Sequence, residues 1–288
     1  MDITAEFEAE RQRLFDIAYR MLGSANEADD VVQDGWLRWQ STNHDTVRNP
    51  AAFLTTVISR LALDRLKSAR RQRETYSGPW LPEPIATSAG PESATILGES
   101  VMLGFLAVLE RLGPAERAVF VLRDVFGLSY PEISDIVDRS VDNCRQIAHR
   151  ARIRIRADRP RVTPNLDRDR RLLDAFLYAL SSGETGHLEQ LFHQEVVLIS
   201  DGGHHVRAAR RPILGASRVA RFLVGIAKNA RVGNTHLEYL TINNQVSACI
   251  TLDGGEMTLF IIEPTGSDDK INRVFVVRNP DKMGRLGN

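Results

Sequence analysis

The stretch YPEISDIVDRSVDNCRQIAHRARIRIR, residues 130–156, contains two helical patterns separated by a very short turn. Apolar residues recur at helical spacing from Tyr130 to Val137 and again from Ser140 to about Arg156, and Asp138-Arg139 joins the two segments. Two helices across so tight a turn are typical of a helix-turn-helix. A plain helical hairpin with a basic rim is the alternative interpretation of these residues.

The second of these helices is predicted to present a polar face to solvent. Its inward positions are Val141, Cys144, Ile147, Ala148 and Ala151, and its outward positions include Asn143, Arg145, Gln146, His149 and Arg150. Asn and Gln can pair with adenine and Arg with guanine in a major groove, whereas the tail of Arg152, Arg154 and Arg156 can neutralise phosphates. This face therefore favours duplex DNA as a partner.

Charge lies in opposed blocks along the chain, although the formal net charge of the 288 residues is zero. Residues 1–47 hold 4 Arg against 10 acidic side chains, and residues 48–73 hold 7 basic side chains against Asp64. Residues 139–161 hold 8 Arg against 2 Asp, while residues 165–288 are nearly balanced. Two basic blocks in a neutral chain favour phosphate contacts, and solvated helix faces are the alternative.

The composition, 43% hydrophobic and 26% charged, is that of a globular protein. No apolar run approaches the roughly 20 residues that span a bilayer, and the acidic start MDITAEFEAERQR lacks a signal-peptide pattern. We therefore expect a cytoplasmic protein with no membrane partner. The two cysteines, Cys144 and Cys249, exclude a disulfide framework and a cysteine-rich metal site. No metal site, cofactor or catalytic residue is predicted.

Residues 1–76 are predicted to form an all-helical domain. Helices are expected at Glu6–Leu22, Ala28–Gln40 and from Asn49-Pro50 onward, since apolar residues recur at three and four positions. The middle helix gathers Asp29, Asp30, Gln33 and Asp34 opposite its apolar side.

The rest of the chain is predicted to contain a linker and two further domains. Prolines exclude a regular helix or central strand at residues 77–92, which we expect to be extended. Helices at Ser93–Leu112 and Ala115–Phe126 precede the helix-turn-helix and give a second helical domain at residues 93–160. Residues 165–288 are predicted to form an α+β domain with an antiparallel sheet. Its strands are expected at Glu195–Ser200, His205–Arg211, His236–Asn243, Val246–Leu252, Met257–Glu263 and Ile271–Val277, with a hairpin turn at Asn243-Asn244.

Several motifs in the first 160 residues resemble the ECF sigma factors, RNA polymerase initiation factors with only sigma2 and sigma4 domains. EADDVVQD at 27–34 is similar to the acidic helix that docks on the clamp helices of the largest polymerase subunit. NPAAFL at 49–54 with ISRLALDRL at 58–66 is similar to the helix that melts and reads the minus-ten element. LGP at 112–114, YPEI at 130–133 and RAR at 150–152 resemble sigma4, which reads the minus-thirty-five element.

The resemblance implies core RNA polymerase, including its clamp helices and beta flap, and promoter DNA as partners. It places polymerase contacts on Asp29, Asp30, Gln33 and Asp34. Minus-ten contacts are implied for Arg60, Asp64, Arg65, Lys67, Arg70 and Arg71, and minus-thirty-five contacts for Asn143, Arg145, Gln146, His149, Arg150, Arg152 and Arg154. Exposed helix residues without base contact are the alternative for each of these side chains.

Three further motifs resemble the ECF subgroup fused to a SnoaL-like, NTF2-type domain. They are WLPEP at 80–84, DGG at 201–203 and NPDK at 279–282, and His204-His205 depart from the pattern of the second. The expected fold is two all-α sigma domains followed by an α+β cone. We hypothesise that the cone regulates the sigma domains in cis through contacts of Trp80, Pro82, Asp201, Gly202, Gly203, Asn279, Pro280, Asp281 and Lys282.

Two alternative functions belong to other classes. The cone could be an enzyme that uses Asp201, His204, His205 or His236 as a base, or a pocket for a small ligand that the sequence does not identify. The chain could also be a one-component regulator that binds duplex DNA alone. That reading leaves the acidic helix and the melting helix without a role.

Overall fold

The computed structural model describes residues 2–73, 75–87, 102–158, 165–230, 235–266 and 269–286, without the side chains of residues 70–72, 157–158 and 229–230. The chain divides into two compact units. The first comprises Met1–Thr75 and Phe105–Arg159, and the second comprises Tyr76–Gly104 and Pro160–Asn288.

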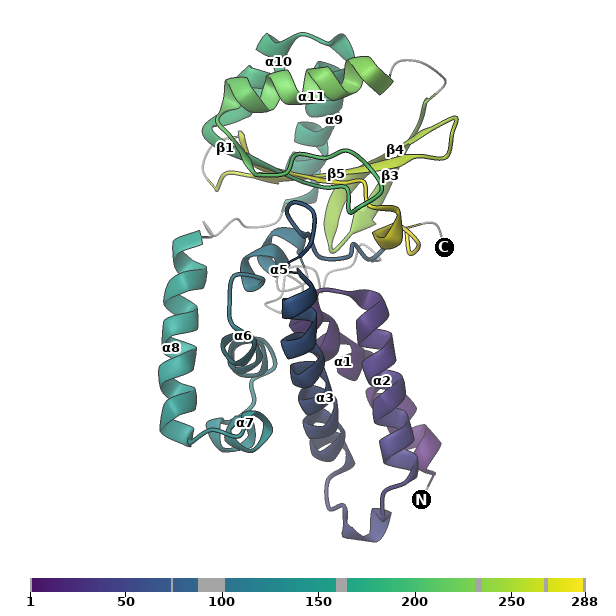
Figure 1. The fold of residues 1–288 in the computed structure, drawn as a ribbon, viewed down its shortest axis with the longest axis vertical. Coiled ribbons are helices and arrows are strands. Elements are labelled where there is room, and N and C mark those ends of the chain that lie inside the picture. Colours follow the sequence, from purple (N-terminus) through teal and green to yellow (C-terminus); the bar gives the residue numbers. More distant parts are fainter. Residues whose placement is uncertain are drawn as a thin grey trace. The chain divides into compact units, whose positions relative to one another are not determined.

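The amino-terminal part of the first unit is helical, as predicted. It contains α1 (Ile3–Leu22), α2 (Ala25–Gln40), the short 3-10 helix η1 (His44–Thr46) and α3 (Pro50–Arg73) (Figure 1). Gly23 ends α1 in the left-handed region at φ 69°, and the Ser24 hydroxyl accepts from the Glu27 N–H to cap α2. A Cβ at Gly35 would lie 2.4 Å from Ile58 Cδ1, so glycine lets α2 approach α3 closely.

The rest of the first unit contains the helix-turn-helix. Its elements are α5 (Leu103–Leu109), of which the first two residues belong to the second unit, α6 (Pro114–Phe120), the π-helical segment η3 (Val121–Val125), α7 (Tyr130–Val137) and α8 (Val141–Asp158). The early part of the helix expected from Ser93 lies outside the described residues. Ser129 and Glu132 form a reciprocal cap at the start of α7, and Asp138 ends that helix at φ 53°. The tight turn between α7 and α8 is confirmed.

One buried arginine connects the two halves of the first unit. The Arg117 side chain is 1% exposed, pairs with Glu110, and donates from Nε to the carbonyl oxygen of Arg20 on α1 at 3.1 Å. Burial lowers the pKa of Arg117, and the Glu110 carboxylate opposes that effect. Removal of this guanidinium would leave Glu110 with Arg73 as its remaining ion-pair partner and would remove the side-chain donor to the carbonyl oxygen of Arg20.

The second unit is an α+β domain, which confirms the predicted class. It contains α9 (Leu166–Ser182), α10 (Thr185–Leu191), β1 (Phe192–Asp201), β2 (Ile213–Leu214), α11 (Ala216–Ala230), β3 (Thr235–Ile242), β4 (Gln245–Leu252), β5 (Met257–Pro264), β6 (Ile271–Val277) and the 3-10 helix η4 (Pro280–Lys282). Within the described residues, the sheet has the order β2-β1-β6-β5-β4-β3. The helices cover one face of this sheet, and their apolar sides form the core with it (Figure 1).

Two details of the predicted sheet are wrong. The sheet is mixed rather than antiparallel, because β6 returns between β5 and β1 and pairs parallel with β1. The strand expected at His205–Arg211 is a loop, and the short strand beyond it, Ile213–Leu214, pairs antiparallel with β1. Gly202 starts that loop where a Cβ would lie 2.1 Å from the Val206 carbonyl oxygen, so the chain turns away from the sheet. The Asn243-Asn244 hairpin turn is confirmed, with φ of 51° and 59°.

Candidate functional site

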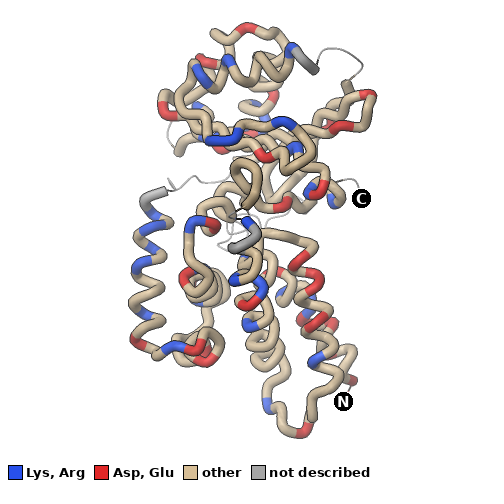
Figure 2. Tube along the Cα trace, in the orientation of Figure 1, with Lys and Arg blue, Asp and Glu red and all other residues tan. Residues whose placement is uncertain are grey.

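The acidic residues of α2 lie on one exposed stripe of that helix. Asp30, Gln33 and Asp34 are exposed, and Leu37, one turn further along, is a large apolar side chain that is 56% exposed. Asp29 is half-buried beside them. Figure 2 shows acidic residues recurring along α2. A negative stripe that also carries an exposed leucine is suited to a basic partner surface with an apolar contact.

The polar residues of α3 are engaged with groups of the same unit. Arg65 Nη2 lies 2.5 Å from Asp30 Oδ2 on α2. Arg65, which is predicted to contact the promoter, and Asp30, which is predicted to contact the polymerase, therefore form an ion pair with each other. Lys67 pairs with Asp64 at 2.9 Å, and both side chains are exposed. The side chains of Arg70 and Arg71 lie outside the described residues. Exposed pairs of this kind are weak and can be exchanged for nucleic-acid phosphates.

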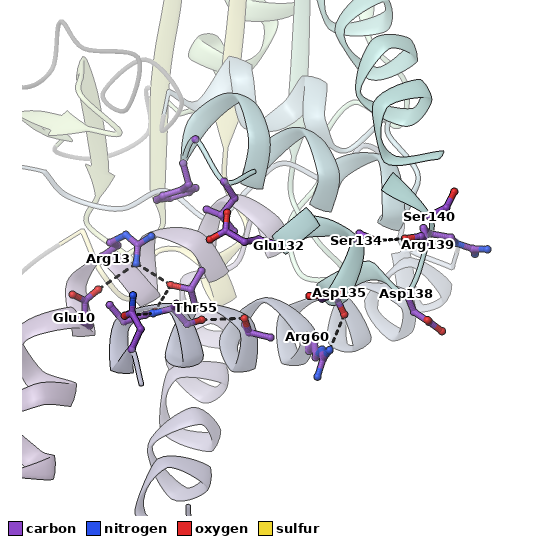
Figure 3. Close-up of a pocket in the computed structure, with 17 residues that line it drawn as sticks. Glu10, Arg13, Thr55, Arg60, Glu132, Ser134, Asp135, Asp138, Arg139 and Ser140 are labelled. Carbon is purple, nitrogen blue, oxygen red and sulfur yellow. Dashed lines mark hydrogen bonds and ion pairs between the residues drawn. The ribbon is translucent and has the colours of Figure 1, made fainter. Parts of the chain in front are cut away.

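A polar cleft of about 1070 Å³ separates α1 and α3 from α7 and the turn before it (Figure 3). On one wall, Arg13 donates to Thr55 at 2.9 Å and pairs with Glu10. Across it, Arg60 Nη2 donates to the main-chain carbonyl oxygen of Asp135 at 2.7 Å, which joins α3 to α7. The predicted minus-ten residue Arg60 thus holds the helix-turn-helix against the amino-terminal helices.

On the outward face of α8, some polar side chains form ion pairs with described residues and others do not. Asn143, Gln146, His149 and Arg150 are exposed and form no hydrogen bond or ion pair through their side chains with the described residues. Arg145 pairs with Asp142 at 2.6 Å on the same helix. Arg152 pairs with Asp124 at 2.7 Å and Arg154 with Glu116 at 2.6 Å, which ties the basic tail of α8 to the preceding helical segments. Figure 2 shows basic residues recurring along α8.

In the second unit, the buried carboxylate of Asp201 holds the linker. Its Oδ2 accepts the Leu81 N–H at 2.8 Å and lies 2.7 Å from Lys282 Nζ, while Oδ1 accepts the Tyr76 hydroxyl at 2.6 Å and the Gly203 N–H at 3.0 Å. The Asp201 side chain is 0% exposed and that of Lys282 is 9% exposed. We call these five residues the linker clamp.

Lys282 completes the clamp from the carboxyl-terminal side. Its ammonium group also donates to the Leu81 carbonyl oxygen and lies 4.0 Å from the centroid of the Trp80 ring. A buried ammonium that has a carboxylate, a carbonyl and an aromatic face as partners is compensated for the loss of water. Pro82 is buried beside these groups. The motifs at 80–84, 201–203 and 279–282 therefore meet at one place.

Asn279 and the glycines shape the clamp. Asn279 Nδ2 donates to the Tyr76 hydroxyl at 2.9 Å, and a Cβ at Gly203, whose φ is 61°, would lie 2.7 Å from Asn279 Cγ. Burial is the main cause that raises the pKa of Tyr76, and the hydrogen bond to Asp201 raises it further. Pro280 is exposed, and exposed Asp281 pairs with His205 at 3.2 Å. Asp281 is thus a surface residue of the motif rather than part of its buried contacts.

Two family models match this chain: Sigma-70 region 2 at residues 7–72 and Sigma-70, region 4 at residues 103–155. The ECF RNA polymerase sigma factor SigJ of Mycobacterium tuberculosis is 34% identical over 289 residues, which cover 97% of this chain and 92% of SigJ. This chain belongs to the ECF RNA polymerase sigma factors. The crystal structure of SigJ matches with a TM-score of 0.74 at 31% identity and covers 99% of both chains. The probable ECF sigma factor SigI of the same species is 34% identical over 220 residues, 75% of this chain and 74% of SigI.

As an ECF sigma factor, the protein directs transcription initiation, binds core RNA polymerase and promoter DNA, and is not an enzyme. The helix-turn-helix lies inside the region 4 match and is its DNA-binding element. No helix among the described residues is long and apolar enough to cross a membrane.

Sequence reasoning missed part of the linker contact in this sigma factor. Residues 85–87 pair with the end of β3: the Asn243 N–H donates to the Ile85 carbonyl oxygen at 2.9 Å, and the Thr87 N–H donates to the Thr241 carbonyl oxygen at 2.9 Å. Tyr76 was missed as well. Its position, two residues before the Gly78-Pro79-Trp80 stretch, was the available signal, since a tyrosine has a large apolar ring and a hydroxyl that usually finds a hydrogen-bond partner when it is buried.

Proposed function

We propose that this sigma factor docks on the polymerase clamp helices through α2, reads the two promoter elements through α3 and α8, and is regulated in cis by its carboxyl-terminal unit. The observation that carries the regulatory part is the buried Asp201–Lys282 pair, which binds the main chain of the linker on both sides of Leu81. The proposed place of action is the cytoplasm, where polymerase and promoter DNA meet.

The α2 stripe supports the polymerase contact. Asp34 and Gln33 are exposed, and Leu37 supplies an apolar centre beside them. Electrostatic attraction would speed association with a basic helix pair and would be screened by salt. Asp30 would exchange its partner Arg65 for a polymerase cation, which would free Arg65 for the promoter strand. Polymerase binding and minus-ten recognition would then be linked through one ion pair.

The exposed face of α8 supports recognition of the minus-thirty-five element. Asn143 and Gln146 have the amide groups that pair with adenine, and Arg150 has the guanidinium that pairs with guanine. Because these side chains have no partner among the described residues, base contacts would not require an internal bond to be broken. Arg152 and Arg154 would contact phosphates from the positions in which Asp124 and Glu116 hold them.

The contact between Arg60 and Asp135 supports a closed state of the sigma domains. The minus-ten and minus-thirty-five elements are named by their distance from the transcription start, so they lie about 25 base pairs apart. At 3.4 Å per base pair, this separation is about 85 Å of duplex. A unit in which α3 and α7 share a hydrogen bond cannot reach both elements together. The sigma domains must therefore separate before the promoter is read.

The linker clamp would limit that separation. Residues 76–87 are held on the second unit by Asp201, Lys282 and the end of β3. An extended chain spans at most about 3.3–3.6 Å per residue, so release of this segment would add up to about 40 Å of reach. The clamp would thus set the distance between sigma2 and sigma4 and bias which promoters are occupied.

The test measures core binding and promoter opening separately for full-length protein and two clamp variants, Asp201→Asn and Lys282→Met. Asp281→Asn is the matched control, because that carboxylate belongs to the same motif and is exposed. We expect both clamp variants to bind core polymerase as the wild type does and to change promoter opening and transcript yield. Unchanged promoter opening in both variants would refute regulation through the linker.

A further inference from the structure

The second unit contains a cavity that the proposed function does not use. Its volume is about 690 Å³, within the range of small-molecule sites in proteins. It lies between α9, α11 and the strands β3, β4 and β5. Every residue that lines it belongs to the second unit.

The body of the cavity is apolar. Its walls include Leu177 from α9, Phe222 and Ile226 from α11, and Leu237, Ile250 and Leu252 from the sheet. None of these six side chains is among the fully buried residues, and Leu237 is 43% exposed. Large apolar side chains that stay in contact with solvent inside a concave site favour an apolar ligand, because the ligand would remove that surface from water.

One end of the cavity is positively charged. Among the described residues that line it, the charged ones are Arg207, Arg278 and Glu256. Arg278 Nη2 lies 3.4 Å from Glu256, and Nη1 donates to the Arg207 carbonyl oxygen at 3.0 Å. The Arg278 Nε atom is buried without a hydrogen-bond partner in the described residues. Arg207 is exposed, and its guanidinium forms no ion pair with them.

These charges determine whether the cavity favours an anionic or a cationic ligand. Glu256 neutralises one arginine, so the polar end keeps one net positive charge and unused N–H donors. A carboxylate satisfies such donors in pairs, whereas an amine would meet a like charge. The described residues of the lining include no histidine or cysteine, and Glu256 is engaged with Arg278. The site therefore has the groups for binding an anion and lacks a free acid or base for turnover.

We propose that this cavity binds a small organic anion with an apolar body, whose carboxylate lies against Arg207 and Arg278 and whose hydrocarbon or aromatic skeleton lies between α9, α11 and the sheet. The ligand is a monocarboxylate, because a second charged group would be placed among Leu177, Ile226 and Ile250. None of the described residues that line this cavity belongs to the linker clamp, although the Arg278 N–H donates to the Asp201 carbonyl oxygen at 2.7 Å.

The first experiment measures binding of three probes to the full-length chain by titration calorimetry. Dodecanoate, below its critical micelle concentration, tests an aliphatic anion, and 2-naphthoate tests an aromatic one. Dodecylammonium has the same tail as dodecanoate with the opposite charge. We expect at least one carboxylate to bind with one-to-one stoichiometry and dodecylammonium to bind at least roughly ten-fold more weakly. Equal binding of the anion and the cation, or no binding of either carboxylate, would overturn the proposal.

Variants then locate the site. Arg207→Gln removes an exposed charge that forms no ion pair with the described residues, and should weaken binding of the carboxylate probe roughly five-fold or more. Arg211→Gln is the matched control, since Arg211 is exposed on the same loop and does not line the cavity, and should bind as the wild type does. Ile226→Trp fills the apolar end and should abolish binding, with circular dichroism to check the fold. Binding that survives both Arg207→Gln and Ile226→Trp would place the ligand elsewhere and refute the assignment.

Discussion

Replacement of Asp201 by Asn tests how strongly the second unit holds the linker. The substitution keeps the shape of the side chain but removes the charge that faces Lys282 at 2.7 Å. Loss of one partner of a buried ion pair costs about 3–5 kcal/mol, because the other charge stays buried. Lys282 retains the Leu81 carbonyl and the Trp80 ring, which offset about 1 kcal/mol. The linker contact should therefore weaken by about 2–4 kcal/mol.

Hydrogen exchange of the linker measures this change directly. The Leu81 N–H donates to Asp201, and the Thr87 N–H is paired with β3, so both amides exchange only when the linker leaves. At 1.4 kcal/mol for each factor of ten, the predicted weakening accelerates exchange by roughly thirty-fold to several hundred-fold. If the free energy that holds the linker in the wild type is smaller than this loss, the linker amides lose their protection from exchange altogether. The assay is exchange mass spectrometry on peptides that cover residues 79–87.

Two further variants make the test specific. Asp281→Asn removes a carboxylate that is 70% exposed, and should change linker exchange by a few-fold at most. Asp201→Asn combined with Lys282→Met removes the buried cation as well, and should recover part of the protection because an apolar side chain fills a similar volume. Equal exchange in the wild type and Asp201→Asn, or an equal acceleration by Asp281→Asn, would show that the buried pair does not hold the linker.

The remaining predictions concern the sigma domains and the pH dependence of the clamp. Asp34→Arg should weaken core polymerase binding several-fold at low salt and little at high salt, as measured by equilibrium titration at two ionic strengths. Gln146→Ala should lower discrimination at one minus-thirty-five position by about 1–3 kcal/mol, whereas Arg154→Ala should weaken all promoter variants alike in a binding assay. Because the folded state raises the pKa of Tyr76, the clamp should be stable below the ordinary tyrosine pKa of about 10 and lose stability as the pH rises further. A tyrosinate absorbance titration should therefore lose one late-ionising group in Tyr76→Phe, and an unchanged titration would contradict this assignment.

The helices of the first unit could be predicted because their signals are local. The cap formed by Ser129 and Glu132 and the apolar spacing of α7 and α8 lie within a few residues of one another. Position Asp138 shows the limit of such signals. The sequence indicates a tight turn there, but only the structure shows that aspartate adopts the left-handed region where glycine is favoured.

The sheet order and the use of individual side chains could not be predicted in the same way. Parallel pairing of β1 with β6 joins residues 76 to 79 positions apart, and no local pattern specifies which edge a strand will join. The pairing of Arg152 with Asp124, 28 positions apart, is also non-local. The three motifs of the clamp were found through resemblance, whereas their convergence on one carboxylate depends on the folded chain.

The pairing of residues 85–87 with β3 has a consequence for how the linker can leave. Within the described sheet β3 is an edge strand, and edge strands have main-chain groups that readily join another extended chain. When the linker departs, Asn243 loses a carbonyl acceptor and Thr241 loses a donor. A vacated edge would either take back its own segment or accept a strand from another molecule. An extended peptide would therefore compete with the linker for this edge and would shift the equilibrium towards the released state.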